Sequence, residues 1–427
     1  MDVRTKALMD FLDSAHSVFH AVAGLEKTLA ENGYTCLQEN KSWELVPGGK
    51  YYVTRGGAAV TAFRVPETAC KGFLMSASHA DRPTFKVKEN GEQVSAYTRL
   101  LVERYGGMLM APWLDRPLSI AGRVLVETEK GVESKLVDID RDLLMIPNVA
   151  IHMNRKANEG YAYNPAVDML PLLGGKDAKG KLNALLEQEA GGKILGHDLY
   201  LYVRQKASVW GVEEEYISSA ALDDLECAWG CTQGFLKAGE SKSIPVLCVF
   251  DSEEVGSNSV QGAASMLLPD VLERICHALG LNMKQMLAQS FMVSADNAHA
   301  VHPNHPEYAD AGNAPVMGGG VVLKFNASQR YTTDGLSAAI FRKVCAEAGV
   351  KVQSYCNRAD IAGGSTLGHI SLTHVSVPTA DIGLPQLAMH SCYETAAVAD
   401  ALALEDAMAA FYSKSLAVSA AGEYTLA

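Results

Sequence analysis

Four apolar, strand-like segments of the sequence end in side chains that could bind a metal ion. They are GFLMSASHAD, with His79 and Asp81; IPVLCVFDSEE, with Asp251, Glu253 and Glu254; SFMVSADNAH, with Asp296 and His299; and HVSVPTADIGLP, followed closely by His390. Open α/β sheets bind their ligands at the carboxyl ends of the strands, so these four ends are expected to converge. The pattern predicts a cluster of imidazoles and carboxylates at one edge of a sheet.

Such a donor set, with little sulfur, suits Zn²⁺ and also Co²⁺ or Mn²⁺. Five or six groups are more than one tetrahedral zinc ion takes, and they suit a pair of ions roughly 3.5–4 Å apart. A metal pair lowers the pKa of a bridging water and polarises a carbonyl group, and a glutamate left over can carry the proton. The predicted chemistry is metal-assisted hydrolysis of an amide bond.

Asp223 and Asp224, in AALDDLECAWGCTQGFL, precede a helical pattern. Aspartate is a preferred N-cap, so capping is the ordinary interpretation, although a carboxylate at a helix start can also bridge two cations. Asp296 could equally form a turn in ADNAH. The sequence alone leaves these alternatives open.

The other candidates also have ordinary interpretations. His79 and Asp81 could form a local hydrogen bond in a loop, or the carboxylate could orient a metal-binding imidazole. His390 could be a buried core histidine. Glu253 and Glu254 could lie in a solvated turn, but charges beside a buried strand need partners, and divalent cations are strong ones. We expect a helix to start soon afterwards, in VQGAASMLL.

The elements that must position these groups follow from periodicity. Residues 1–40 have helical spacing, and YYVTRGGAAVTAFRV predicts a hairpin. Short β-like runs dominate from about 95 to 215, where LLGGKDAKGKLN indicates an exposed loop, and apolar strands alternate with helices from about 220 onward. We predict an α/β fold with a central, mostly parallel sheet flanked by helices. Residues 1–92 and 216–427 would form the catalytic domain, and residues 93–215 an inserted β-rich dimerisation or lid domain.

Composition excludes several classes of protein. The chain has 427 residues, 48% hydrophobic and 20% charged, with a net charge of −12 and no basic stretch, so nucleic acid is not an expected partner. No apolar segment approaches the roughly 20 residues that span a bilayer, and the N-terminus has no signal-peptide pattern. Nine scattered cysteines without a CxxC pair favour reduced thiols and a cytoplasmic location.

The sequence resembles the aspartyl aminopeptidases, a family of dinuclear-zinc metallopeptidases, along essentially its whole length. The segments that carry the resemblance are FLDSAHSVFHAV, GGKYYVTRGG, SHADRPTFKVK, YGGMLMAPWLDRPLSIAGRV, IPNVAIHMNR, LDDL, DSEEVGS, DNAHAVHPNHPE, KFNASQRYTT, GGSTLGHI and DIGLPQLAMHS. Their order and spacing together are far more specific than any one of them.

The resemblance implies a role for each matching residue. The implied zinc ligands are His79, Asp223, Glu254, Asp296 and His390, with Asp223 bridging two ions per subunit. Glu253 corresponds to the general base, and Asp81 to the carboxylate behind the first histidine. Lys324 and His299 resemble substrate-binding residues, and His152 resembles a histidine that reaches a neighbouring subunit's active site. Members of the family form dodecamers built from dimers, so a homo-oligomer is expected.

Four departures from the usual family sequence stand near these residues. LDD replaces the usual LDN, so Asp224 adds a carboxylate beside the bridging position. HADRP replaces HTDSP and places Arg82 near the first ligand. Ala15-His16 replaces a Ser-Pro, and RADIAGGST differs from the usual wording before GST. None of these changes removes an implied ligand or the base.

The predicted protein is an aminopeptidase that removes N-terminal residues, Asp or Glu in particular, from peptides. A metal-bridging hydroxide would be the nucleophile and Glu253 the general base, with Lys324, or next Arg330, balancing an acidic side chain. A related deacylase or carboxypeptidase is the alternative within the dinuclear-zinc hydrolases. A catalytically silent assembly or peptide-binding module is the alternative outside the enzymes.

Overall fold

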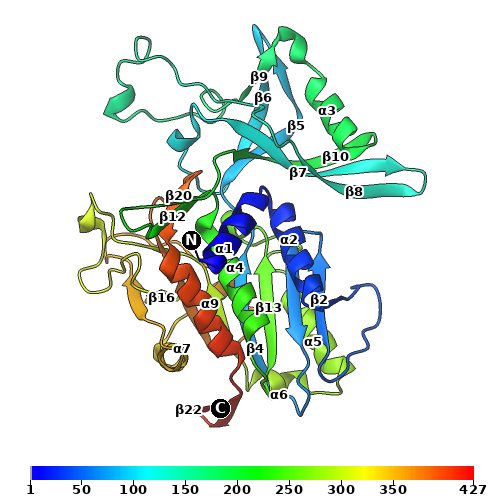
Figure 1. Cartoon of the computed structure of the whole chain (residues 1–427), viewed down its shortest axis with the longest axis vertical. Coiled ribbons are helices and arrows are strands. Elements are labelled where there is room, and N and C mark those ends of the chain that lie inside the picture. Colours follow the sequence, from blue (N-terminus) through cyan, green and yellow to red (C-terminus); the bar gives the residue numbers. More distant parts are fainter. Residues whose placement is uncertain (1) are drawn as a thin grey trace.

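The chain folds into two units stacked along the long axis of the molecule (Figure 1), as described by a computed structural model covering residues 2–427. The larger unit contains a nine-stranded mixed sheet with helices on both faces, and the smaller unit contains a six-stranded antiparallel sheet. The predicted α/β fold with an inserted β-rich part is confirmed.

The large sheet has the strand order β1-β2-β3-β13-β4-β14-β18-β16-β17. The bounds are β1 Thr35–Cys36, β2 Lys50–Arg55, β3 Ala59–Arg64, β13 Ile244–Phe250, β4 Phe73–His79, β14 Phe291–Ala295, β18 Thr379–Gly383, β16 Val321–Phe325 and β17 Val352–Cys356. β2 and β3 form the predicted antiparallel hairpin. The neighbours β13, β4, β14 and β18 run parallel, so their carboxyl ends lie along one edge of the sheet.

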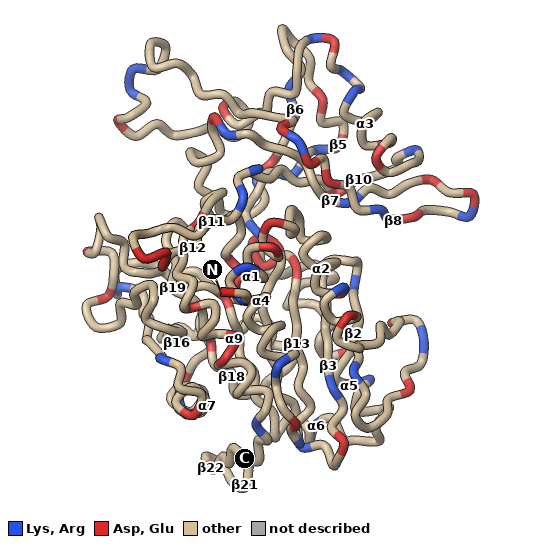
Figure 2. The backbone as a smooth tube through the Cα atoms, in the orientation of Figure 1, with Lys and Arg blue, Asp and Glu red and all other residues tan. Residues whose placement is uncertain are grey.

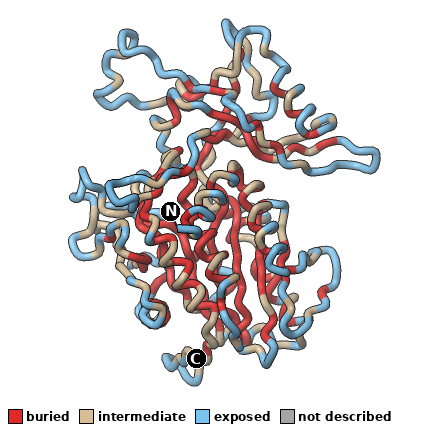
Figure 3. The backbone as a smooth tube through the Cα atoms, in the orientation of Figure 1, coloured by how far each residue is buried: buried red, intermediate tan, exposed pale blue. Residues whose placement is uncertain are grey.

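Helices cover both faces of this sheet. On one face lie α1 Val3–Ser14, α2 Val18–Glu31, α4 Leu222–Lys237, α7 Gly335–Glu347 and α9 Val398–Tyr412; on the other lie α5 Leu267–Ala278, α6 Met283–Leu287 and α8 Leu367–Ser371. Residues of one strand alternate between the two cores, with Leu74 in the first and Met75 in the second. The central strands are therefore buried on both sides (Figure 3), which explains their continuous apolar runs.

The smaller unit has the strand order β8-β7-β10-β5-β6-β9 and its own apolar core. Its elements are β5 Thr84–Val94, β6 Tyr97–Tyr105, β7 Leu118–Thr128, β8 Gly131–Asp138, β9 Leu172–Gly175, α3 Lys181–Ala190 and β10 Ile194–Val203. The sheet thus begins nine residues before the expected boundary at residue 93. β10 ends well before residue 215. We therefore propose that the inserted unit spans residues 84–203.

The remaining elements are short. They are β11 Ser208–Trp210, β12 Tyr216–Ser219, β15 Ala298–His299, β19 Pro385–Gln386, β20 Glu394–Ala397, β21 Leu416–Ala420, β22 Glu423–Leu426 and the 3₁₀ helices η1 Ala111–Trp113, η2 Ala157–Glu159, η3 Lys176–Ala178, η4 Glu253–Val255 and η5 Pro306–Tyr308. β11, β12 and β20 form a separate small sheet. In residues 2–427, no helix has the length and apolar character needed to cross a membrane.

One local expectation is wrong. LLGGKDAKGKLN is not a loop, because it contains β9, η3 and the start of α3, whose Leu182 and Leu186 are buried against the small sheet. The helix expected in VQGAASMLL is α5, which begins at Leu267 near the end of that segment, after turns and bends. Lys and Arg residues are scattered among Asp and Glu over both units (Figure 2).

Candidate metal centre

The predicted strand ends converge at the carboxyl edge of the large sheet. His79 is the last residue of β4, Glu254 lies in η4 just after β13, and Asp296 directly follows β14. His390 lies in the turn after β19, and Asp223 lies at the start of α4 with non-helical backbone angles. The structure therefore brings together all five residues that the sequence nominates as ligands.

Asp223 lies at the middle of the cluster. Its Oδ1 is 3.5 Å from His79 Nε2, and its Oδ2 is 3.5 Å from His390 Nε2. His390 Nε2 is also 3.4 Å from Glu254 Oε2. Each oxygen of one carboxylate thus faces a different imidazole, which is the arrangement expected of a carboxylate shared by two cations.

Two sets of side chains place their ligand atoms within 4.8 Å of one another. The first set is His79, Asp223 and Glu254, and the second is Asp223, Asp224 and Asp296. Asp223 Oδ1, Asp224 Oδ1 and Glu254 Oε1 are buried and make no hydrogen bond within residues 2–427. Because unpaired buried carboxylates are costly, these atoms and the imidazole–carboxylate donor set fit divalent cations such as zinc.

Both histidines are oriented through their second ring nitrogen. His79 Nδ1 lies 3.1 Å from the backbone oxygen of Asp81, and His390 Nδ1 bonds the backbone oxygen of Gly107. With Nδ1 as the donor to these carbonyls, Nε2 of each ring carries the lone pair that a metal ligand needs. Gly107 follows β6, so the inserted unit contributes to the geometry of the site.

Asp81 fixes the loop that carries the two glutamates. Its carboxylate accepts hydrogen bonds from the backbone N–H groups of Glu253 at 3.1 Å and Glu254 at 3.2 Å, and from Tyr105 Oη at 2.8 Å. The adjacent Gly106 has φ +79°, and a Cβ there would lie 3.0 Å from the Glu254 Cβ. Asp81 therefore supports both the first histidine and the glutamate pair.

Glu394 is a part of the site that the sequence analysis did not identify. Its buried carboxylate accepts from the backbone N–H of Asp223 at 3.0 Å and from that of His390 at 2.7 Å. It thus holds the two residues in position through their main chains. The only available signal was its place four residues after His390, which by itself indicates nothing.

The protein without cations concentrates negative charge in a buried volume. Burial, together with the charge of Asp296, raises the pKa of Glu253 to about 8. Burial raises the pKa of Asp296 to about 6, although Lys324 opposes the shift. Burial opposes protonation of His390, but its hydrogen bond with Asp223 raises its pKa to about 9. Glu253 therefore has the environment of a group that can hold and release a proton near neutral pH.

The three expected substrate-binding residues lie in different places. Lys324, on β16, is buried beneath Asp296. The His299 ring is exposed, and its centroid is 6.0 Å from that of Tyr355. His152 is exposed on the loop between β8 and η2, outside the cluster. Arg82, which stands in one of the segments that differ from the usual family sequence, lies near the carboxylates of Asp81 and Glu394. Burial lowers the pKa of its guanidinium to about 10.

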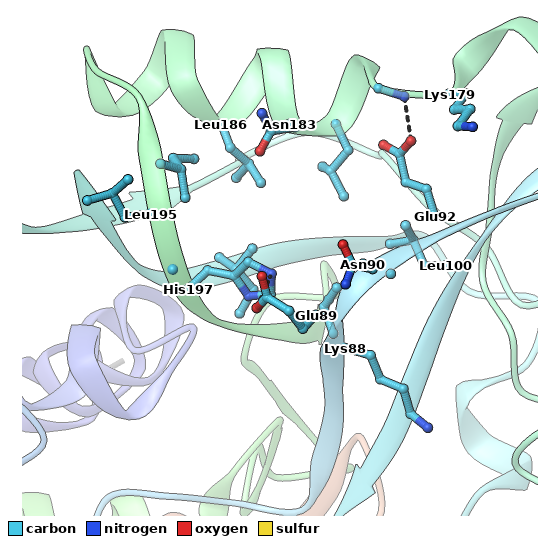
Figure 4. A pocket seen from close by; sticks show the side chains of 17 residues that line it. Lys88, Glu89, Asn90, Glu92, Leu100, Lys179, Asn183, Leu186, Leu195 and His197 are labelled. Atoms are coloured by element: carbon cyan, nitrogen blue, oxygen red, sulfur yellow. Dashed lines mark hydrogen bonds and ion pairs between the residues drawn. The ribbon is translucent and has the colours of Figure 1, made fainter. Parts of the chain in front are cut away.

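A separate cavity of about 400 Å³ lies in the inserted unit between α3 and the strands β5 and β10 (Figure 4). Asn183 and Leu186 of α3 face His197 and Glu89 across it. It contains none of the nominated ligands.

The cluster of histidines and carboxylates at the carboxyl edge of the large sheet has the side chains of a metallohydrolase site. Comparisons with known proteins identify the family. Residues 11–412 match the model of the aminopeptidase I zinc metalloproteases, M18. The chain belongs to this M18 family, and the resemblance to aspartyl aminopeptidases is confirmed. M18 aminopeptidases are zinc-dependent peptide hydrolases.

Relatives and solved structures agree over nearly the whole chain. The chain is 42% identical over 424 residues to a probable M18 family aminopeptidase 2 of Clostridium acetobutylicum, covering 96% of this chain and 98% of the relative. It is 39% identical over 423 residues to one of Pseudomonas putida, with the same two coverages.

Two solved structures support the fold assignment. One chain in the structure of an Ape4–Nbr1 complex is 34% identical, with a TM-score of 0.92, covering 96% of this chain and 85% of that one. The S. cerevisiae mApe1 dodecamer is 26% identical, with a TM-score of 0.85 and 96% coverage of both chains.

Proposed function

We propose that this M18 aminopeptidase uses two zinc ions per subunit to remove N-terminal acidic residues from peptides. The observation that supports this most is the placement of the two Asp223 oxygens, each 3.5 Å from the Nε2 of a different histidine. Glu254 and Asp296 complete two overlapping sets around it. Co²⁺ or Mn²⁺ could replace zinc with this donor set.

When bound, the metal pair supplies a Lewis acid that polarises the scissile carbonyl and acidifies water. Glu253 takes the proton of the attacking water and passes it to the leaving amine. Burial of the Glu253 carboxyl favours its protonated form, so it can hold the proton between the two steps. Asp81 acts through position, because it holds the backbone N–H groups of Glu253 and Glu254.

The acidic side chains around the cations that are not themselves ligands suit a free α-amino group, because that group is positively charged. An N-acylated substrate has no such charge, so a deacylase would not need them. We expect the zinc-loaded protein to cleave Asp- and Glu-terminated dipeptides and to leave their N-acetyl forms intact, as followed by chromatography of the products. Cleavage of the acetylated form at a comparable rate would point to a deacylase and contradict the proposal.

An acidic first side chain needs a cation, and β16 with the residues after it offers two. Lys324 Nζ donates to the Asp296 backbone oxygen at 2.6 Å, lies 3.2 Å from Asp381 Oδ1 and makes a long contact of 3.5 Å with the Asn297 backbone oxygen, which a substrate carboxylate would replace. Arg330 is exposed and lines a cavity of about 760 Å³. Thr333 lines the same cavity and donates to the Asp381 backbone oxygen, which links the cavity to Lys324.

We propose Lys324 as the main partner of the acidic side chain and Arg330 as the second. Lys324→Met should reduce the ratio of kcat/KM for Asp over Leu substrates by on the order of tenfold or more, because a charged hydrogen bond is lost. Arg330→Met should reduce it less. A Lys324→Met enzyme with an unchanged ratio would exclude Lys324, and a larger fall in the Arg330 variant would reverse the order.

We also propose that the protein is a homo-oligomer, built from dimers into a dodecamer, in which His152 completes a neighbour's active site. The loop around His152 exposes Val149, Ile151 and Met153, the last at 80%. Apolar side chains grouped on an exposed loop are typical of an interface. The S. cerevisiae mApe1 structure, which covers the same fold, is a dodecamer.

Mixed oligomers test this role of His152. His152→Ala and Glu253→Gln subunits would each be inactive alone, for different reasons. Dissociated and reassembled together in equal amounts, they should recover activity at roughly a quarter of the sites, where an intact Glu253 meets an intact His152. A His152→Ala protein with full activity, or no recovery in the mixture, would contradict the proposal.

A further inference from the structure

The cavity between α3 and the strands β5 and β10 has no role in the proposed mechanism, and it has the size of a ligand site (Figure 4). Its volume of about 400 Å³ lies within the range of about 300–1,000 Å³ that is usual for small molecules. Within residues 2–427, the neighbouring strands β5 and β10 pair only at Lys86 and Tyr200. The pairing of β5 with β6 is also interrupted between Val87 and Glu92. The cavity therefore lies where the two strands separate.

Buried leucines form much of the cavity wall. Leu182 and Leu186 come from α3, Leu100 from β6 and Leu199 from β10. All four belong to the apolar core of the inserted unit. Such a wall gains free energy when it covers methylene groups instead of water. The middle of a bound ligand is therefore expected to be apolar.

Two polar atoms of the wall, Glu92 Oε1 and His197 Nδ1, are buried and make no hydrogen bond within residues 2–427. The other carboxylate oxygen of Glu92 accepts the backbone N–H of Gly180, which fixes the side chain. His197 Nε2 faces Glu89 Oε2 at 3.8 Å, which favours the ring proton on Nε2 and leaves a lone pair on Nδ1. Both unpaired atoms are then acceptors, and each needs a donor.

These acceptors stand apart across the cavity (Figure 4). His197 and Glu89 lie together, and Glu92 lies apart from them near the start of α3. Two lysines also line the cavity, but both are exposed, and Lys88 extends away from it. Neither Lys88 nor Lys179 bonds the unpaired atoms. A ligand that supplies both missing partners therefore carries a donor at each end.

We propose that this cavity binds a linear aliphatic diamine or polyamine. One ammonium group donates to Glu92 Oε1, and another donates to His197 Nδ1 beside the Glu89 carboxylate. The methylene chain between them packs against the leucines. An ammonium group has three N–H donors and a positive charge, which suit these acceptors, whereas an anionic ligand would bring more acceptors. None of these residues belongs to the proposed metal centre, so the site forms with or without zinc.

Isothermal titration calorimetry with spermidine, octylamine and octanoate tests this site. Spermidine should bind saturably, octylamine on the order of tenfold more weakly because it has one ammonium group, and octanoate not measurably. Glu92→Gln should weaken spermidine binding by on the order of tenfold or more, because the glutamine oxygen accepts from Gly180 and its amino group faces the ligand.

Asn183→Trp is a second variant, because Asn183 is exposed on α3 and faces the cavity. The indole should fill the cavity and block spermidine while every acceptor stays in place. This variant carries the test if circular dichroism shows that Glu92→Gln does not fold. Glu133→Gln, an exposed acid on β8 outside the cavity, is the control for general attraction of a polycation to a chain of net charge −12. It should leave the affinity within about twofold of wild type.

Zinc-loaded and metal-free wild-type proteins should bind spermidine equally well. Binding only to the metal-free protein would place the amine among the carboxylates of the metal centre and overturn the proposed site. Absence of saturable binding, or wild-type affinity in the folded Glu92→Gln and Asn183→Trp proteins, would overturn it as well. None of these outcomes bears on peptide hydrolysis, so this site and the proposed function can fail separately.

Discussion

The proposed ligands around Asp223 are held in position by side chains that are not ligands themselves. Asp223 and His390 are held through their backbone N–H groups by one buried carboxylate, Glu394. Glu253 and Glu254 are held in the same way by Asp81. Such partners orient ligands without contacting the cation, so their loss changes metal affinity and rate more than it changes the fold.

Replacing Glu394 with glutamine should weaken zinc binding roughly 10- to 100-fold. A glutamine has one acceptor oxygen, so its amino group would face one of the two backbone N–H donors of Asp223 and His390. Competition with a chromophoric chelator measures the zinc dissociation constant.

The exposed Glu240→Gln provides the control for a simple loss of one negative charge, and it should leave zinc affinity unchanged. A zinc affinity of the Glu394 variant within twofold of wild type would show that the carboxylate does not position the ligands.

Three of the proposed ligands could be predicted from the sequence because each follows a recognisable apolar strand, whereas the proposed role of Asp223 depends on the family resemblance. His79, Glu254 and Asp296 lie within four residues of the ends of β4, β13 and β14. Glu394, Tyr105 and Gly107 could not be predicted, because their contacts join segments far apart in the chain. The separate roles of Glu253 and Glu254 depend on the family resemblance, since their chemical types are identical.

At the scale of elements, α2 links the two units. It contacts β3 of the large sheet and β7 of the small sheet. Where it meets the small sheet, the Arg123 guanidinium lies 4.4 Å from the Phe19 ring, and the rings of Phe19 and Tyr200 are 6.5 Å apart. His20 follows in the same helix, with its Nδ1 2.8 Å from Ser17 Oγ. Side chains along this helix therefore lie at the junction between the two sheets.

Acid should weaken the fold through His20. Burial lowers its pKa to about 4 from the ordinary 6.5, although the charge of Asp138 opposes the shift. The unfolded chain thus binds the proton more tightly, so the stability that neutral His20 contributes is full above pH 6.5 and is lost as pH falls toward 4. The loss is at most roughly 3 kcal/mol, less because the side chain is partly exposed.

The His20→Asn variant should accordingly show a smaller fall in melting temperature between pH 6.5 and pH 4.5 than the wild-type protein. Differential scanning calorimetry of both proteins across this range isolates the contribution of this residue, because the other acids titrate in both. Parallel melting curves would mean that His20 titrates equally in the folded and unfolded chains.

Periodicity predicted most of the elements but not all of their limits. The helices near the N-terminus, the β2–β3 hairpin and the central strands agree with the structure. The division that we propose between the units differs from the expected one because β5 continues directly from the segment SHADRP without a turn-rich linker. α3 was missed because its glycine- and lysine-rich start hides the buried spacing of Leu182, Leu186 and Ala190.

At the scale of the whole molecule, the inserted unit carries the exposed apolar loop proposed to meet another copy. Met153→Glu should weaken assembly, because a charge would be buried where Met153 now offers an apolar surface with 80% exposure. Sedimentation velocity at several concentrations should show smaller species for this variant. Val3→Glu, at a comparably exposed position on α1, is the control. An unchanged distribution for Met153→Glu would place the interface elsewhere.

The proposed function requires above all that Glu253 acts beside a cation pair to hydrolyse peptides with a free N-terminus. The direct measurement is zinc content together with turnover of an Asp-terminated dipeptide for wild type and Glu253→Gln. The variant should retain about two zinc ions per chain, since Glu253 is not a ligand, while kcat falls by roughly 10²–10⁴-fold for lack of the proton carrier. A Glu253→Gln protein that keeps wild-type turnover would contradict the proposed function.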